Sequence, residues 1–197
     1  MVNGSYMAPE MGSAWLDLAA TLRGRFREPA RQTDLIEDPR ALQSWLAARG
    51  LGPRRTPTAE DVIAAQRLRE TVHVLARALA TGQPLDPVLV RRLNQILRAA
   101  GPAGLLLRLD SGGSLVASRP ADASEALARI ARQAAADLTG PRAGRLRTCG
   151  DETCSGVFFD DTGRRRWCSD EGCGVRVRVR AHRARRAERE PPTKGNA

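Results

Sequence analysis

Four cysteines, the only ones in the chain, lie within its last quarter at the spacing C-x4-C-x13-C-x4-C. They are Cys149, Cys154, Cys168 and Cys173. Two pairs with equal internal spacing can bring four sulfur atoms around one ion, and thiolates in a tetrahedral array suit Zn²⁺. A zinc ion with four protein ligands has no open position for water or substrate, so we expect one structural zinc ion.

Two other uses of the four thiols stay open at this point. An iron–sulfur cluster takes the same ligands, and two disulfides are a further arrangement. The segment from Met1 to Met11 has no basic stretch followed by an apolar run, as a secretory signal would have. We therefore expect a cytoplasmic protein with reduced thiols, which favours zinc.

Arginine is concentrated around the predicted zinc site. Residues 1–140 carry 18 basic and 14 acidic side chains, a net charge of +4, whereas residues 141–197 carry 14 and 8, a net charge of +6. Guanidinium groups pair with phosphate oxygens and with the guanine edge, so the cluster predicts contact with DNA. An acidic protein partner and a merely solvated surface are alternatives, because arginine is abundant throughout this chain. The candidate DNA-binding residues are Arg164, Arg165, Arg166, Arg176, Arg178, Arg180, Arg183, Arg185 and Arg186.

The segment after the fourth cysteine has two conformations open to it. Val175, Val177 and Val179 alternate with arginines, which is the period of a half-buried strand. As a helix, the same segment places Val175, Val179 and His182 on one face, and the alanines that follow favour a helix. A helix would also direct its positive N-terminal end at the thiolates. We favour a basic helix.

The residues before the cysteines predict helices with clear boundaries. Asp38-Pro39, Thr58 with Asp61, and Asp86-Pro87 supply caps and first-turn prolines. With apolar residues at steps of three and four, these signals predict helices at about residues 39–49, 59–81, 87–100 and 122–138. The apolar runs 105–109 and 114–117 flank a Gly-rich turn, which predicts a β-hairpin.

Signs of catalysis are weak, and we expect no enzyme. His73 lies in the longest predicted helix without a Cys or Ser partner at a telling spacing, and we expect it at the rim of that helix. Asp17 and Thr21 lie one helical turn apart beside Trp15 and form a candidate ligand pocket, although an internal hydrogen bond or a helix cap also explains them. No apolar run approaches the ~20 residues that cross a membrane.

The cysteine region resembles the CGNR zinc finger from Leu146 to Arg186. Shared features are the two cysteine pairs, an aromatic-Asp step after the first pair, the segment R-R-W-C-S, and C-G-V-R at the fourth cysteine. The family has C-G-N-R there, so Val175 replaces the signature Asn, and any contact of that Asn with the helix or a base is lost. Phe158, Phe159 and Trp167 are expected to form an apolar cap over the metal.

The upstream residues are similar to the ABATE domain that precedes such fingers. The similarity lies in W-L-D-L-A-A-T at 15–21, in a Trp45-Leu46 helix ending in Gly50-Leu51, and in R-L-R-E at 67–70. It implies a mostly helical module that senses stress or a ligand, in a protein that regulates transcription by binding DNA.

Together these observations predict a mainly α fold. We expect a helical domain with one β-hairpin at residues 1–140, a small four-cysteine zinc-finger module with a C-terminal basic helix at 141–190, and a disordered tail at 191–197. The leading hypothesis is a cytoplasmic, zinc-dependent DNA-binding transcription regulator whose helical domain senses a signal or forms a homodimer. The alternatives are a finger that docks on an acidic surface of the transcription machinery, and a small-molecule-binding protein or enzyme with a purely structural zinc.

Overall fold

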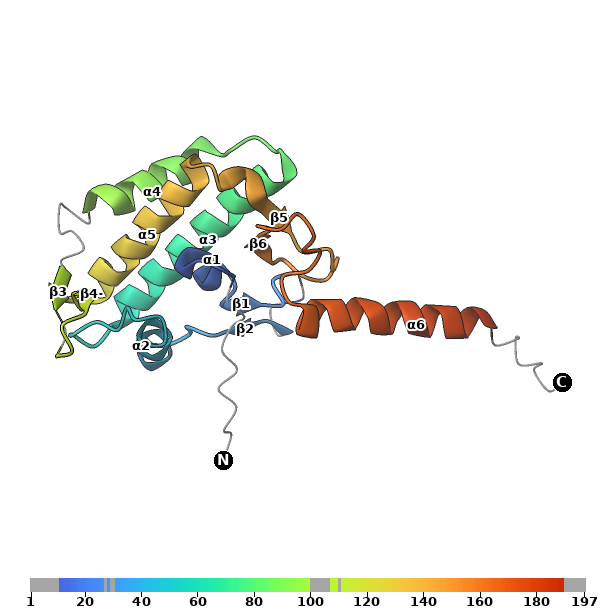
Figure 1. Cartoon of the computed structure of the whole chain (residues 1–197), viewed down its shortest axis with the longest axis horizontal. Coiled ribbons are helices and arrows are strands. Elements are labelled where there is room, and N and C mark those ends of the chain that lie inside the picture. Colours follow the sequence, from blue (N-terminus) through green and yellow to red (C-terminus); the bar gives the residue numbers. More distant parts are fainter. Residues whose placement is uncertain (1–10, 27, 29–30, 100–106, 110, 190–197) are drawn as a thin grey trace, which may run out of the picture.

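The computed structural model describes residues 11–26, 28, 31–99, 107–109 and 111–189 (Figure 1). Helices dominate these residues, strands are few and short, and the four cysteines gather in the C-terminal part. The predicted mainly α fold with a small zinc module is therefore confirmed. The tail predicted to be disordered, 191–197, lies outside the described residues.

The first three helices begin where polar residues cap them. Helix α1 spans Ala14–Ala19, α2 spans Pro39–Ala47 and α3 spans Ala59–Thr81. Asp38 accepts a hydrogen bond from a backbone N–H in the first turn of α2, as predicted. At the start of α3, the side chain of Thr58 and that of the third helical residue satisfy each other's backbone N–H groups in a capping box. These caps explain why the sequence located both starts correctly.

Helix α4 (Pro87–Ala99) and helix α5 (Ala123–Thr139) pack beside α3 and complete the helical layer (Figure 1). Between them, strands β3 (Leu107–Leu109) and β4 (Leu115–Ala117) pair antiparallel, which confirms the predicted hairpin. The predicted end of α4 before Gly101 lies outside the described residues.

The structure adds two hairpins that the sequence did not predict. Strands β1 (Leu22–Arg23) and β2 (Thr33–Asp34) pair after α1, and β5 (Leu146–Thr148) pairs with β6 (Val157–Phe159), with the first cysteine pair in the loop between them. A short 3₁₀ turn at Ala143–Arg145 leads from α5 into β5. Each hairpin is only two or three residues long on each side, too short for an alternating pattern to stand out.

The β5–β6 hairpin is part of the main hydrophobic core. Leu146, Val157, Phe158 and Phe159 are all buried, and β5 packs against α3. The ring of Phe159 meets that of Trp15 in α1 edge to face, with 5.9 Å between the centroids. The core therefore runs without interruption from the helices into the cysteine region.

The shared core bears on two expectations from the sequence, the aromatic cap over the metal and the domain boundary near residue 141. Phe159 does not form a cap over the metal, because its ring meets Trp15 of α1 in the core. Phe158 is buried in the same core, and its ring lies under the guanidinium of Arg165. Trp167 is half-buried, and its ring lies beside Gly150 and Gly174, the residues that follow Cys149 and Cys173, as well as beside arginine side chains, so its place in a cap stays a prediction. The division of the chain near residue 141 stays a prediction, since both parts contribute to one core.

A single basic helix leaves the body of the molecule. A five-residue π-turn, Asp170–Gly174, leads directly into helix α6, Val175–Arg189. The predicted helix is thus confirmed and the strand alternative is wrong. Figure 1 shows α6 extending away from the other helices, and Val175 and Val179 are 44% and 42% exposed. The apolar face predicted for this helix therefore does not pack on the body. Within the described ranges, no helix is both long and apolar enough to span a bilayer.

Candidate metal centre and basic surface

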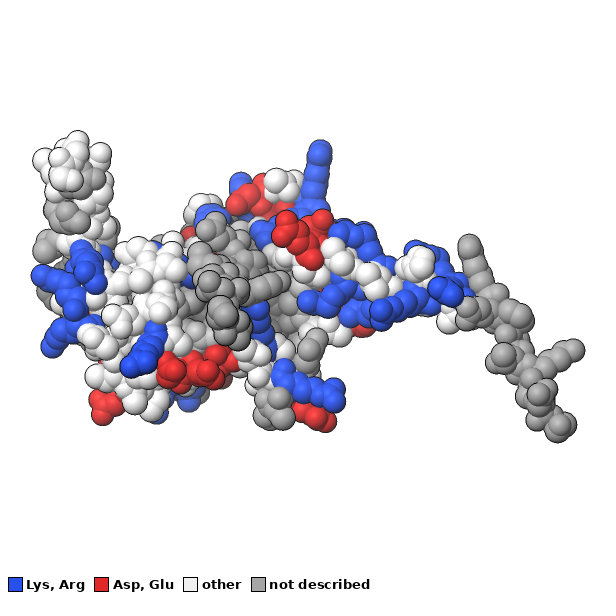
Figure 2. All heavy atoms as spheres, turned by 90° about the horizontal axis from the view of Figure 1, so that it is seen from below, with Lys and Arg blue, Asp and Glu red and all other residues white. Residues whose placement is uncertain are grey.

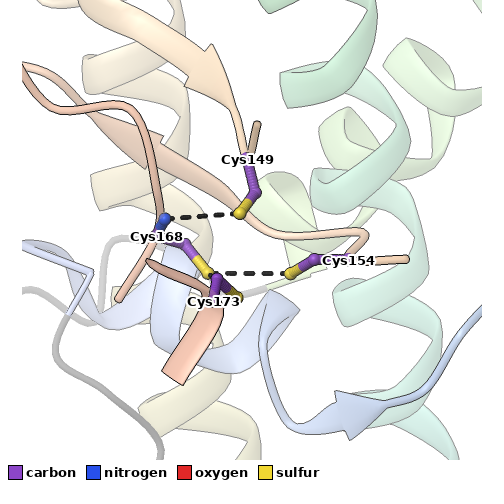
Figure 3. Close-up of side chains that lie close together, drawn as sticks. All are labelled: Cys149, Cys154, Cys168 and Cys173. Carbon is purple, nitrogen blue, oxygen red and sulfur yellow. Dashed lines mark hydrogen bonds between the residues drawn. The ribbon is translucent and has the colours of Figure 1, made fainter. Parts of the chain in front are cut away.

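The four cysteines come from the loops around one hairpin. Cys149 directly follows β5, Cys154 lies in the loop before β6, Cys168 lies after β6, and Cys173 lies in the π-turn that opens α6 (Figure 3). Their Sγ atoms all lie within 4.8 Å of one another. Cys154 and Cys168 Sγ are 3.6 Å apart, and Cys168 and Cys173 Sγ are 3.4 Å apart. A tetrahedral site with Zn–S bonds of about 2.3 Å places its sulfurs about 3.8 Å apart, so this cluster fits one zinc ion.

Hydrogen-bond donors surround the sulfurs. The backbone N–H of Gly156 donates to Cys154 Sγ over 3.3 Å. The backbone N–H of Cys168 donates to Cys149 Sγ over 3.5 Å (Figure 3). Arg176 Nη2 lies 2.9 Å from Cys173 Sγ. Such donors stabilise the negative charge that thiolates carry around a metal and fix their orientation.

Gly156 also gives the sulfurs their room. A Cβ atom at this position would lie 2.9 Å from Cys168 Sγ and 3.2 Å from Cys154 Sγ. Any side chain here would displace two ligands, so the close approach of the loop to the metal requires glycine.

Without an ion, the crowded thiols oppose one another's ionisation. Hydrogen bonds from the thiols of Cys154 and Cys168 lower the pKa of Cys149. Donating to Cys149 raises the pKa of Cys154 to about 12. Four thiolates this close repel one another, so a cation at their centre is what allows all four to be ionised together.

A buried carboxylate links the first cysteine pair to α6. Asp151 is fully buried, and its two oxygens accept from Arg176 Nε over 2.9 Å and from Arg180 Nη2 over 2.7 Å. The hydroxyl of Thr153 donates to the same group over 2.9 Å. Burial alone would raise the pKa of Asp151, but hydrogen bonds from Arg180 and Thr153 outweigh it and lower the pKa to about 2. Asp151 therefore fixes the first turns of α6 against the cysteine loop, a role that sequence analysis missed.

His73 links the central helix to the same loop. It is buried, so the prediction of a rim position was wrong. Its Nε2 lies 2.9 Å from the carbonyl oxygen of Ser155, the residue after Cys154. Burial lowers the pKa of His73 to about 4. The imidazole is therefore neutral near pH 7, and we assign the ring proton to Nε2, since a carbonyl can only accept.

Among the contacts of the described residues, carboxylates or backbone carbonyls hold four of the nine predicted DNA-binding arginines within the finger. Arg165 donates to the carbonyl of Trp167 over 3.0 Å, and its guanidinium lies 4.6 Å from the centroid of the Phe158 ring. Arg178 pairs with Asp170 over 3.0 Å. The remaining two are Arg176 and Arg180, both held by Asp151.

The other predicted arginines face solvent. Figure 2 shows basic side chains along the part of the surface that α6 forms. The exposed members of the set are Arg164, Arg166, Arg183, Arg185 and Arg186. Within the described part of the chain, no ion pair joins Arg183 or Arg185 to a carboxylate, so both are available to an anionic partner.

The predicted ligand pocket at Trp15, Asp17 and Thr21 falls in the protein interior. All three residues are buried. Their polar groups make internal hydrogen bonds: Trp15 Nε1 to Asp137 Oδ2 at 2.7 Å, Arg49 Nε to Asp17 Oδ2 at 3.1 Å, and Arg69 Nη1 to Thr21 Oγ1 at 3.1 Å. The described residues that line the cavity beside the cysteines include neighbours of these three but none of the three themselves. These side chains hold α1 in place rather than forming a pocket.

Comparison with protein families agrees with this geometry. Residues 12–141, more than half of the chain, match the ABATE family, described as "Putative stress-induced transcription regulator". Residues 145–186 match the CGNR zinc finger, and this match includes all four cysteines. No curated protein matches the chain. The chain therefore belongs to the ABATE family and carries a CGNR zinc finger whose four cysteines are placed to hold one zinc ion.

Proposed function

We propose that this protein is a zinc-dependent DNA-binding transcription regulator, with α6 as the element that contacts the duplex. The observation that carries the proposal is the position of α6, a 15-residue helix that leaves the zinc site with most of its described side chains exposed. A helix with its side chains is about 10–12 Å across, which matches the width of the DNA major groove, about 12 Å.

The arginines then divide into two roles. Arg164, Arg166, Arg183 and Arg185 are exposed and contact the phosphates, while Arg186 lies on the same surface. The engaged arginines, held by carboxylates or a backbone carbonyl, position the helix and the loop before it. This division is sound, because an arginine without an internal partner can neutralise a phosphate and release the counterion condensed on the DNA.

The remaining parts of the proposal concern location and control. The protein acts in the cytoplasm, has no catalytic activity of its own, and works as a homodimer or a monomer whose helical domain responds to a small-molecule effector. Zinc keeps the loops that carry α6 in one arrangement, because its four ligands come from four separate points around the β5–β6 hairpin.

The test is binding of the zinc-loaded chain to a fluorescent random duplex, followed by anisotropy at several salt concentrations. We expect micromolar or tighter binding at low salt that weakens steeply as salt rises. The double variant Arg183→Ala/Arg185→Ala should bind more weakly, and its salt slope should flatten by up to about two units, because each phosphate contact contributes about 0.9.

A matched control removes the same charge elsewhere. Arg91→Ala/Arg92→Ala removes two exposed arginines from α4, which lies on the side of the molecule away from α6 (Figure 1). Its salt slope should equal that of the unaltered chain. Equal slopes for both double variants would exclude α6 as the contact, and no duplex binding even at low salt would favour docking on an acidic protein.

A further inference from the structure

A cavity of about 690 Å³ opens where the ABATE and CGNR parts of the chain meet. Its walls come from α1, from the β1–β2 hairpin and from both cysteine loops. Cavities of about 300–1,000 Å³ hold small molecules, so the size suits an organic ligand.

One side of this cavity is apolar. Leu16 and Ala19 of α1 and Val157 of β6 are buried residues that line it, and Ala20 adds a half-buried methyl group at the end of α1. An apolar wall of this kind provides most of the favourable contact with the body of a bound organic molecule.

The hairpin side of the cavity is basic. Arg23 and Arg31 both line it, on β1 and just before β2, and the hydroxyl-bearing Thr33 lies near them in sequence. Among the residues that the structure covers, no carboxylate forms an ion pair with Arg31, and Glu171 is the one acidic side chain in the lining. Two guanidinium groups next to an apolar wall form a site for a carboxylate, sulfonate or similar group on an apolar body.

The loops of the metal centre form a third part of the cavity lining. Cys154, Cys168 and Cys173 line the cavity, and Arg176, which donates to Cys173 Sγ, lies beside them. A site of four thiolates around one Zn²⁺ is negatively charged, so an anion should lie toward the hairpin and turn its apolar part toward the sulfurs.

We propose that this cavity binds a small organic anion, held by Arg23 and Arg31 and packed against Leu16, Ala19 and Val157. The bound molecule covers Cys154, the half-buried zinc ligand, and joins the β1–β2 hairpin to the loops that carry α6. Any effect of this ligand on DNA binding rests on the function proposed above. Binding of the ligand to the cavity does not.

The direct test is a fluorescence titration of the zinc-loaded full chain with 8-anilinonaphthalene-1-sulfonate, a small aromatic sulfonate. We expect one saturable site. Arg23→Ala/Arg31→Ala should weaken it about tenfold or more, as expected for lost charge-assisted hydrogen bonds. Ala20→Trp, which fills the cavity without changing its charge, should remove the site.

The controls separate this site from other dye-binding surfaces. Arg40→Ala removes an exposed arginine of α2 that does not line the cavity and should leave the affinity unchanged. The single variant Arg31→Ala, at an exposed position, repeats the test if the double variant does not fold. Equal affinity in the unaltered chain, the arginine variants and Ala20→Trp would place the dye elsewhere, such as on the exposed leucines of β3 and β4, and would overturn the proposal.

A second readout reports the metal centre. The rate of zinc transfer to a chromophoric chelator should fall when the dye is bound to the unaltered chain. In Ala20→Trp, added dye should leave this rate unchanged. Transfer that the dye does not slow would overturn the placement against the sulfurs. Neither readout needs DNA. A protein that binds the dye but no duplex contradicts only the proposed function. A protein that binds the duplex but not the dye contradicts only this site.

Discussion

His73 Nε2 lies 2.9 Å from the carbonyl oxygen of Ser155, so the central helix is hydrogen-bonded to the loop that carries a zinc ligand. The two residues are 82 positions apart, and His73 is 4% exposed. This buried hydrogen bond holds the loop against α3, and its loss would leave a buried carbonyl without its donor. The metal centre and the helical part are therefore coupled in stability.

The burial of His73 predicts an acid-dependent loss of stability. Burial lowers its pKa from 6.5 to about 4, so the unfolded chain takes up a proton at higher pH than the folded chain does. The stabilisation is complete above pH 6.5 and declines as the pH falls toward 4, by about 2 kcal/mol between pH 7.5 and 5. The free energy of urea unfolding of the zinc-saturated chain, measured at both pH values, tests it.

The matched variant is His73→Gln, whose amide can donate to the same carbonyl without titrating. Zinc ligands also take up protons in acid, but they do so equally in both proteins, so the difference between them isolates the histidine. His73→Gln should lose about 2 kcal/mol less than the unaltered chain over this pH range. An identical pH dependence would show that His73 does not titrate as its burial requires.

Loss of the metal should affect more than the finger, because the β5–β6 hairpin, whose loop carries Cys149 and Cys154, lies in the main core. Cys168→Ser should release about one zinc ion per chain, measured by elemental analysis, and should lower the melting temperature of the helical signal as well. Chelation of the unaltered chain is the matched treatment, since added zinc should restore its melting temperature but not that of the variant. An unchanged zinc content would refute the four-cysteine site.

Phe158 tests the shared core without touching the metal ligands. It is fully buried on β6, and Phe158→Ala should lower the free energy of unfolding by about 3–5 kcal/mol, as for other buried phenylalanines. Phe26→Ala is the control, because that ring is 52% exposed and stacks only with Arg77 among the described contacts of its ring, so its loss should cost less than about 1 kcal/mol. Similar losses in the two variants, measured by urea unfolding, would contradict a core that includes β6.

Asp151 should control how firmly the base of α6 is held. Asp151→Asn removes the charge that pairs with Arg176 and Arg180, and amide hydrogen exchange in the first turns of α6 should become about tenfold faster. Asp170→Asn is the control, since its pair with Arg178 is exposed on both sides and contributes little. If the two variants exchange alike, the buried carboxylate is not what fixes the helix.

Much of the fold followed from local signals. The caps at Asp38 and Thr58 satisfy backbone groups within three residues, so the sequence marks these helix starts directly. The cysteine spacing likewise predicts the zinc ligands, because a metal imposes its own geometry on four sulfurs.

The contacts that join the helical part to the cysteine region could not be predicted from such local signals. Strand β6 has all three residues buried, with Phe159 between Trp15 and the guanidinium of Arg142, so no alternation of apolar and polar residues marks it as a strand. The pairs of Asp151 with arginines of α6 span 25 and 29 positions. A weak signal for them does exist, since two arginines four residues apart lie on one helix face and repel each other unless a carboxylate lies between them.

The projection of α6 from the body gives it the properties of a lever. With 15 residues at about 1.5 Å each, the helix is about 22 Å long, and a tilt of about 10° at its base moves its far end by about 4 Å. That displacement exceeds the length of a hydrogen bond, so a rearrangement around Asp151 too small to disturb the core would move the outermost arginines from one bonding partner to the next.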